Sequence, residues 1–282
     1  MHQLHLCIGR ITTQGQLSNN RFSRMEYCRH ALLTACHGFN RHLSVLQTPG
    51  GFLYDYQDLR KYETGRSSTY EHFSAITENA EKLVSQLMDD RPLKTLLKTK
   101  TDFVTLGIDV FDINNFRIQA ELVCTYNTNR QKVIYWTGKS YPTKEQENSL
   151  IYCPDLKTHF QEINGLPFLI LGCHDLNLFS PRSRASISKG SYKDKTISEM
   201  QALSDRFKPY VVLQHPHYTD SPNIWQPGWS GIKRWVPSAR IYSSGIHYAN
   251  REGKHPRKPL QSILLRTALG PVENFTVPLI GT

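Results

Sequence analysis

A cysteine at the end of a short apolar run is the feature of this sequence most directly suited to chemistry. Residues 168–172 are apolar, and Cys173, His174 and Asp175 follow them before a polar segment begins. A short apolar run bounded by polar residues predicts a buried strand, and open α/β folds place reactive groups at strand carboxyl ends. We therefore predict that Cys173 is a nucleophile presented at a strand end. The alternative interpretation is an ordinary buried thiol of the core.

The other cysteines give no sign of a metal site or a disulfide framework. The chain has six, scattered without a CxxC pair or a regular spacing: Cys7, Cys28, Cys36, Cys124, Cys153 and Cys173. This distribution favours reduced thiols, and we predict neither a metal nor a cofactor. No apolar run approaches the roughly 20 residues that cross a bilayer, and residues 1–10 lack the pattern of a signal peptide. The expected location is the cytoplasm, with no membrane partner.

The chain is basic, which limits its choice of partners. Over 282 residues, 34 Lys and Arg against 24 Asp and Glu give a net charge of +10 and a pI of about 9.3. Positive charge is dense over residues 182–208 and 233–258, and such a surface attracts nucleic acid or an acidic ligand. No recognition helix, zinc finger or aromatic RNA-binding motif accompanies it. A basic protein without a polyanionic partner is therefore favoured over a nucleic-acid-binding one.

Strand and helix patterns alternate along the chain. Hydrophobic periodicity and turn signals predict strands at 3–9, 43–47, 103–108, 117–126, 132–136, 168–172 and 210–214, and helices at 20–37, 70–88 and 197–207. This order is typical of an α/β domain with helices layered on a mixed sheet. No repeat or linker divides the chain, so we predict one domain over residues 1–282.

Several segments are informative through their order. In chain order they are the strand 43–47, the hairpin segment 117–142 that contains Lys139, Leu171-Gly-Cys173-His-Asp175, Val212-Leu-Gln-His215-Pro-His217, Trp225 with Trp229, Ser238-Ala-Arg240 and Ser244–Asn250. Together, over roughly residues 3 to 250, they resemble the carbon–nitrogen hydrolase (nitrilase) superfamily. The resemblance implies a four-layer α-β-β-α sandwich in which two mixed sheets are flanked by helices. Residues 180–196 are then a basic insertion, expected as a surface loop or, alternatively, a lid.

The resemblance also implies a covalent mechanism. Cys173 would attack an amide or nitrile carbon and form a thioester or thioimidate that water releases. Lys139 would stabilise the developing negative charge, unless it is an ordinary surface lysine. Asp175 is expected to orient the nucleophile loop, whereas His174 is as readily a surface histidine as a site residue.

The carboxylate that the family uses as a base is missing where the resemblance puts it. Thr48 stands at that position, and a threonine hydroxyl does not accept a proton near neutral pH. Glu145 or Glu147, which follow Lys139, is the best substitute, ahead of Asp55 and Asp109.

The segment after the last predicted strand is expected to shape a substrate pocket. His215 and Trp225 are its candidate binding residues, with Thr48, His174 and Asp175 from the other loops. Aromatic side chains suit a small, partly apolar ligand. Packing in the core or at a subunit interface is the equal alternative for the tryptophans.

The sequence therefore predicts a divergent nitrilase-fold hydrolase that cleaves the C–N bond of a small amide, in preference to a nitrile, through a Cys173 thioester. The alternative is a catalytically impaired nitrilase-fold protein that binds a ligand or a partner. The resemblance further implies a homodimer or a larger homo-oligomer.

Overall fold

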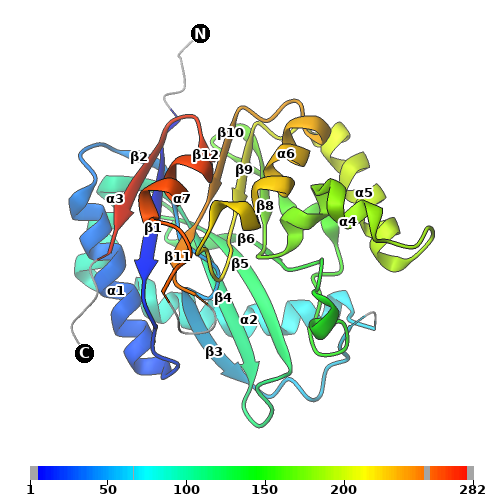
Figure 1. The fold of residues 1–282 in the computed structure, drawn as a ribbon. Helices are drawn as coiled ribbons and strands as arrows, with labels where there is room; N and C mark the ends of the chain where they lie inside the picture. Colours follow the sequence, from blue (N-terminus) through cyan, green and yellow to red (C-terminus); the bar gives the residue numbers. More distant parts are fainter. Residues whose placement is uncertain (1–5, 66, 251–254, 278–282) are drawn as a thin grey trace.

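Two β-sheets form the centre of the molecule (Figure 1). The computed structural model describes residues 6–65, 67–250 and 255–277. The eight-stranded sheet contains β1 (Ile8–Gln14), β2 (Leu43–Gln47), β3 (Leu53–Gln57), β4 (Thr101–Asp112), β5 (Gln119–Asn127), β6 (Lys132–Gly138), β11 (Ile246–Tyr248) and β13 (Val272–Thr276). The five-stranded sheet contains β7 (Phe160–Ile163), β8 (Leu166–Leu171), β9 (Val211–Gln214), β10 (Ile241–Ser244) and β12 (Ala268–Leu269).

Both sheets are mixed, and both have a parallel part. In the larger sheet β1, β2 and β4 run parallel, while β4, β5 and β6 are antiparallel. In the smaller sheet β8, β9 and β10 run parallel. Carboxyl ends of neighbouring parallel strands meet at one edge, where loops carry functional groups. The strand expected at 3–9 corresponds to β1, which begins at Ile8; residues 3–5 lie outside the described residues.

Helices cover the outer face of each sheet. The larger sheet carries α1 (Arg21–Gly38), α2 (Tyr70–Met88) and α3 (Arg91–Lys100), whose buried apolar residues share one core cluster with it. The smaller sheet carries α5 (Tyr192–Phe207) and α6 (Gln226–Trp235), with the short α4 (Pro181–Ala185) beside them; α7 (Leu260–Arg266) precedes β12. In Figure 1, α1 and α3 lie on one side of the sheets and α5 and α6 on the other. The predicted four-layer α-β-β-α architecture is confirmed.

A third apolar cluster holds the sheets together. Strands β1, β2, β4 and β5 contribute Ile8, Val45, Phe103 and Val123, and the smaller sheet contributes Phe168, Ile170, Val211, Leu213 and Ile241 among others. Strands buried on both faces carry continuous apolar runs, which explains why 168–172 is apolar without alternation. Interlocking of these side chains fixes the two sheets relative to each other.

The basic segment 180–196 is more ordered than predicted. Helix α4 lies within it, and α5 begins at Tyr192 rather than at residue 197. The Ser191 side chain caps α5 by accepting a hydrogen bond from the Asp194 N–H. The next turn buries Thr196 and Ile197 against the smaller sheet. The segment is therefore a short helix and the start of a longer one, joined by turns at residues 186–191.

The loops at the carboxyl ends of the two sheets touch each other. The Gly50 N–H, after β2, donates to the Pro216 carbonyl oxygen, after β9, at 3.0 Å. A Cβ atom at Gly50 would lie 2.4 Å from the His215 carbonyl oxygen. The close approach therefore requires glycine, and it joins the ends of the two sheets where the candidate site lies.

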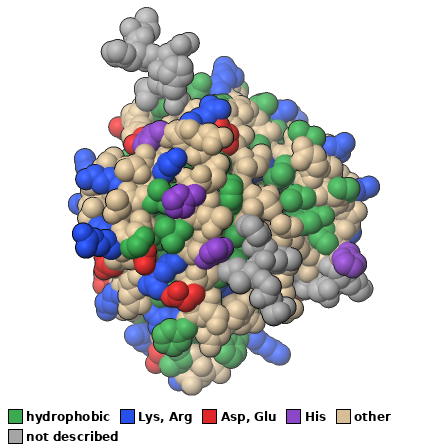
Figure 2. Space-filling view, turned by 90° about the vertical axis from the view of Figure 1, so that its left-hand side faces the viewer, with side chains coloured by type: hydrophobic (Ala, Val, Ile, Leu, Met, Phe, Trp, Pro, Cys, Tyr) green, Lys and Arg blue, Asp and Glu red, His purple; other side chains and the backbone are tan. Residues whose placement is uncertain are grey.

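Positive charge is spread over the surface that Figure 2 shows. Lysine and arginine side chains on this face are interrupted by acidic, hydrophobic and other residues and do not gather into one continuous patch. Among the described residues, no helix is long and apolar enough to cross a membrane.

The inter-sheet cluster gives a direct test of the fold. Phe168 is fully buried in it, so we expect Phe168→Ala to lower the free energy of unfolding by about 3 to 5 kcal/mol through lost burial and a residual cavity. Denaturant titration measures the change. The matched control is Phe116→Ala, because Phe116 is 65% exposed and should change stability by about 0.5 kcal/mol or less. Equal effects of the two substitutions would contradict this packing.

Candidate active site

Cys173 follows β8 and lies almost buried at the junction of the two sheets. Its side chain is 4% exposed, and its Sγ accepts a hydrogen bond from the backbone N–H of His217 at 3.4 Å. The Gln214 side chain, at the end of β9, donates to the Cys173 carbonyl oxygen at 2.8 Å. Strand β9 and the loop that follows it therefore contact both the backbone and the side chain of Cys173.

Asp175 anchors the loop that carries the cysteine. Its Oδ1 accepts from the backbone N–H groups of Ser140 and Tyr141, at 2.9 and 2.7 Å, and its Oδ2 accepts from the Gly172 N–H at 2.9 Å. The carboxylate is fully buried, so both of its oxygens act inside the protein. It ties the Cys173 loop to the chain that directly follows Lys139.

Lys139 and Glu121 form a buried ion pair beside the cysteine. The Lys139 ammonium lies 2.8 Å from Glu121 Oε1, with exposures of 1% and 8%. Gln146 bridges them, because its Oε1 accepts from Lys139 at 2.6 Å and its Nε2 donates to Glu121 Oε1 at 2.8 Å. Burial acts against both charges, but each offsets this for the other: the pKa of Glu121 lies well below, and that of Lys139 above, its ordinary value.

The β4–β5–β6 hairpins produce this pair. In the antiparallel register Asp109 on β4 stands opposite Glu121 on β5, and Gly138, next to Lys139, stands opposite Leu122. The Lys139 N–H donates to the Glu121 carbonyl oxygen at 2.8 Å, just beyond the end of β6. Cross-strand neighbours have close Cβ atoms, so the register alone brings both carboxylates and the lysine to one end of the sheet.

His217 connects the two carboxylates to the cysteine loop. Its Nε2 lies 2.7 Å from Asp109 Oδ1, and its Nδ1 lies 3.6 Å from Glu121 Oε2. Burial lowers the pKa of His217, but Asp109 and Glu121, together with Cys173, raise it well above its ordinary value. His217 is therefore an imidazolium held between two carboxylates.

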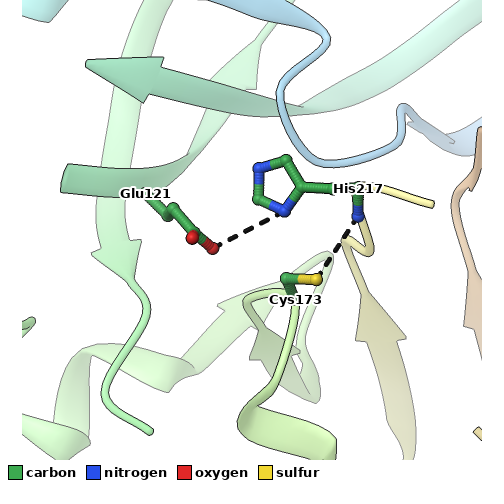
Figure 3. Close-up of side chains that lie close together, drawn as sticks. All are labelled: Glu121, Cys173 and His217. Atoms are coloured by element: carbon green, nitrogen blue, oxygen red, sulfur yellow. Dashed lines mark hydrogen bonds and ion pairs between the residues drawn. The ribbon is translucent and has the colours of Figure 1, made fainter. Parts of the chain in front are cut away.

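The thiol of Cys173 is acidic in this setting. Burial raises its pKa, but the positive fields of His174 and His217 and hydrogen bonds with these two residues lower it to about 5. Figure 3 shows Glu121, Cys173 and His217 converging from three segments. Their carboxylate, sulfur and ring nitrogen atoms all lie within 4.8 Å of one another. The lowered pKa favours the thiolate, which is the reactive form of cysteine, beside the Glu121 carboxylate and the Lys139 ammonium.

A cleft of about 600 Å³ opens onto these groups. The side chains that line it include Tyr54, Glu145, His174, Tyr218 and Trp225, in addition to Cys173, Lys139, Glu121 and His217. Trp225 packs edge-on against the His174 ring with centroids 5.7 Å apart. The volume suits a small molecule, which would lie between Cys173 and the aromatic side chains of Trp225, Tyr54 and Tyr218.

The structure brings some of the predicted site residues together and separates others. Cys173, Lys139, His174, Trp225 and Glu145 line the cleft.

Glu147 does not line this cleft; its carboxylate pairs with Lys193 at 2.5 Å beside a separate, smaller pocket. The Thr48 hydroxyl donates to the Thr105 carbonyl oxygen at 3.1 Å and accepts from the Gly107 N–H at 3.1 Å. His215 is fully buried, and burial lowers its pKa to about 3. None of these three side chains is among those that line the cleft at Cys173.

Sequence reasoning missed Glu121 and His217 and ranked Asp109 low. The signal for Glu121 was present, because a single carboxylate interrupts the apolar strand Ala120-Glu-Leu-Val-Cys124. A buried charge of this kind needs a partner, and Lys139 at the end of the next strand supplies it. His217 sits two residues after His215, so a small difference in the path of the loop decided which histidine enters the site.

Comparison with solved structures identifies the fold. The Nit3 protein of Saccharomyces cerevisiae, a member of branch 10 of the nitrilase superfamily, has 13% sequence identity and a TM-score of 0.56, over 89% of this chain and 79% of Nit3. The NitN amidase from Nesterenkonia sp. AN1 has 12% identity and a TM-score of 0.50, over 93% of this chain and 96% of its own.

A variant of that amidase carries the acetamide moiety of fluoroacetamide on its active-site cysteine. It has 13% identity and a TM-score of 0.50, over 88% of this chain and 78% of its own. No protein-family model matches the sequence, and no curated protein sequence matches it. At these identities the likeness is one of fold, and it confirms the fold predicted from the sequence.

The acidity of Cys173 can be measured by alkylation. Because its pKa is lowered to about 5, the iodoacetamide labelling rate should rise through a midpoint near pH 5 and be level by pH 7. His174→Asn removes one of the positive fields and should move the midpoint to higher pH. Cys153 is the internal control, since burial raises its pKa. A Cys173 midpoint at the ordinary thiol value of about 8.5 would contradict an activated thiolate.

The buried ion pair should be visible in stability. Lys139→Met leaves the Glu121 carboxylate without its main counter-ion, so we expect a loss of about 3 to 5 kcal/mol in the free energy of unfolding. The double variant Lys139→Met/Glu121→Gln should lose less, because the unpaired charge is removed. The control is Lys193→Met, whose partly exposed pair with Glu147 should be worth about 1 kcal/mol or less. Additive effects at Lys139 and Glu121 would show that the two charges are not coupled.

Proposed function

We propose that this chain, which has the fold of the nitrilase superfamily, hydrolyses the C–N bond of a small amide through a thioester on Cys173. The observation that carries the proposal is the acidic Cys173 thiol beside the buried Lys139–Glu121 pair at the base of one cleft. A nucleophile, an oxyanion-stabilising cation and a carboxylate are the three groups that this reaction needs. The missing carboxylate at Thr48 is then replaced by Glu121.

In the first half of the reaction the Cys173 thiolate attacks the amide carbonyl carbon. The resulting oxyanion is stabilised by the Lys139 ammonium, which burial and its contacts with Glu121 and Gln146 hold in place. Such preorganised charge is worth most where water is excluded. The leaving nitrogen takes a proton from the His217 imidazolium, and Asp109 holds that ring in orientation.

In the second half, water attacks the thioester. Glu121 is positioned to accept the water proton, because its Oε2 is buried and has no hydrogen-bond partner in the part of the chain that the structure describes. Its lowered pKa makes it a weak base, so it holds the proton only briefly. The same Oε2 faces His217 Nδ1 at 3.6 Å, so the proton can return to the histidine. Return of the proton to His217 restores both the imidazolium and the Lys139–Glu121 ion pair at the end of the cycle.

The site's proton carriers suit an amide substrate. Expulsion of an amine requires an acid at the leaving nitrogen, and the His217 imidazolium supplies one. The fluoroacetamide-labelled amidase described above offers a parallel for a small amide reagent meeting a cysteine in this fold.

The role of Glu121 separates the proposal from the sequence-based choice of base. We expect Glu121→Gln to lower kcat for a small amide by about 10² to 10⁴, the usual contribution of a general base. Glu147→Gln should leave kcat unchanged, because Glu147 pairs with Lys193 and does not line this cleft. Thermal unfolding of both variants controls for stability. Loss of activity in Glu147→Gln but not in Glu121→Gln would overturn the assignment.

The covalent intermediate can be trapped. Hydroxylamine added during turnover should divert the Cys173 thioester to a hydroxamate, and mass spectrometry of quenched enzyme should show the acyl group on Cys173 alone. Cys173→Ala should abolish both signals. Saturable amide binding without acylation or turnover would instead support the ligand-binding alternative.

A further inference from the structure

The cluster at the base of the cleft has the ligand set of a zinc site. The Cys173 sulfur, a ring nitrogen of His217 and a carboxylate oxygen of Glu121 all lie within 4.8 Å of one another (Figure 3). Thiolate, imidazole and carboxylate are the donors that bind Zn²⁺, whereas Mg²⁺ and Ca²⁺ prefer oxygen donors alone. All three residues line the same cleft, so a hydrated cation can reach them.

Glu121 and His217 each have one donor atom that is not held by a hydrogen bond to another residue of the cluster. Glu121 Oε1 is engaged by Lys139 and Gln146, but its buried Oε2 has no hydrogen-bond partner among the described residues. His217 contacts Asp109 through Nε2, which leaves Nδ1 facing Glu121 Oε2 at 3.6 Å. A carboxylate on the far nitrogen of a histidine is the usual support of a metal-binding imidazole.

The charges around the cluster match a divalent cation. With both His174 and His217 neutral, Cys173, Glu121 and Asp109 carry three negative charges and Lys139 carries one positive charge, a net charge of −2. Tetrahedral zinc ligands are about 3.5 Å apart, as follows from bonds of about 2.0 to 2.3 Å. The Nδ1–Oε2 distance of 3.6 Å fits this spacing, and the Cys173 sulfur lies within 4.8 Å of a donor atom of each of the other two residues.

We propose that Zn²⁺ binds reversibly to Cys173 Sγ, His217 Nδ1 and Glu121 Oε2 and thereby blocks the nucleophile. Three lone pairs form bonds to the metal, the Nδ1 proton of His217 leaves to solvent, and a water completes the tetrahedron; nothing is oxidised or reduced. The inhibitory consequence rests on the proposed function, whereas metal binding does not. A single bound Zn²⁺ would occupy the nucleophile Cys173, the proton donor His217 and the base Glu121 together.

Cobalt provides a readout that is independent of activity. Co²⁺ added to the full chain should give a sulfur-to-cobalt charge-transfer absorption in the near ultraviolet, which Zn²⁺ should displace. Cys173→Ser should abolish the band, and His217→Asn and Glu121→Gln should each weaken Co²⁺ binding at least tenfold. The control Cys36→Ala, a buried cysteine of α1, should keep the band. No band in the unmodified chain, or the same band in Cys173→Ser, would overturn the proposal.

A second measurement needs no variant and so avoids misfolding. Zn²⁺ should slow iodoacetamide labelling of Cys173 at least tenfold, and a chelator should restore the rate, whereas Mg²⁺ should have no effect. Labelling at an unchanged rate under saturating Zn²⁺ would overturn the site.

Amide turnover, measured separately in chelator, distinguishes the two proposals. A cobalt band without turnover would support the metal site and refute the hydrolase. Turnover in chelator without a cobalt band would support the hydrolase and refute the metal site. Turnover that persists under saturating Zn²⁺ would overturn the blocking of the nucleophile.

Discussion

The candidate site depends on one interaction, the buried ion pair between Lys139 and Glu121. Neither charge would be stable alone at this depth, because removing an isolated ion from water costs several kcal/mol. Together, with Gln146 bridging them, they place a fixed positive and a fixed negative charge next to Cys173. Asp109 and Glu121 together raise the pKa of His217. The positive fields of His174 and His217 in turn lower the pKa of the Cys173 thiol, since a buried charge stabilises an opposite one nearby.

Two sheets are needed to assemble these charges. The larger sheet supplies Asp109, Glu121 and Lys139 through the register of β4, β5 and β6, and the smaller supplies Cys173 and His217 from the ends of β8 and β9. The apolar cluster around Phe168 fixes the distance between them. Asp175 and the Gly50 contact then hold the loops, so the geometry of the site is a consequence of how the sheets pack.

The same concentration of charge suits the cluster both to amide hydrolysis and to the binding of a divalent cation. A thiolate, an imidazole and a carboxylate are needed both to move protons around an amide and to hold a soft divalent cation. Lys139 donates a hydrogen bond to Glu121 Oε1, which leaves Oε2 free to accept either a proton or a metal ion. Whether His217 carries its Nδ1 proton therefore decides which partner the cluster accepts.

Local patterns along the chain were enough to predict the alternation of strands and helices, and the ordered set of motifs predicted the four-layer fold. Apolar periodicity is a local property, so the strands around Leu43–Gln47 and Lys132–Gly138 and the helices α1 and α2 were close to their observed bounds. Cys173 could be selected because it follows a recognisable strand, and Lys139 because the resemblance places a lysine after the hairpin, at its spacing before Cys173. Only the tertiary structure decided the carboxylate: Glu121 precedes Lys139 by 18 residues, whereas the predicted Glu145 and Glu147 lie closer to it along the chain. Glu147 pairs with Lys193 instead. Strand register, which depends on pairing between distant segments, brought Glu121 to the lysine.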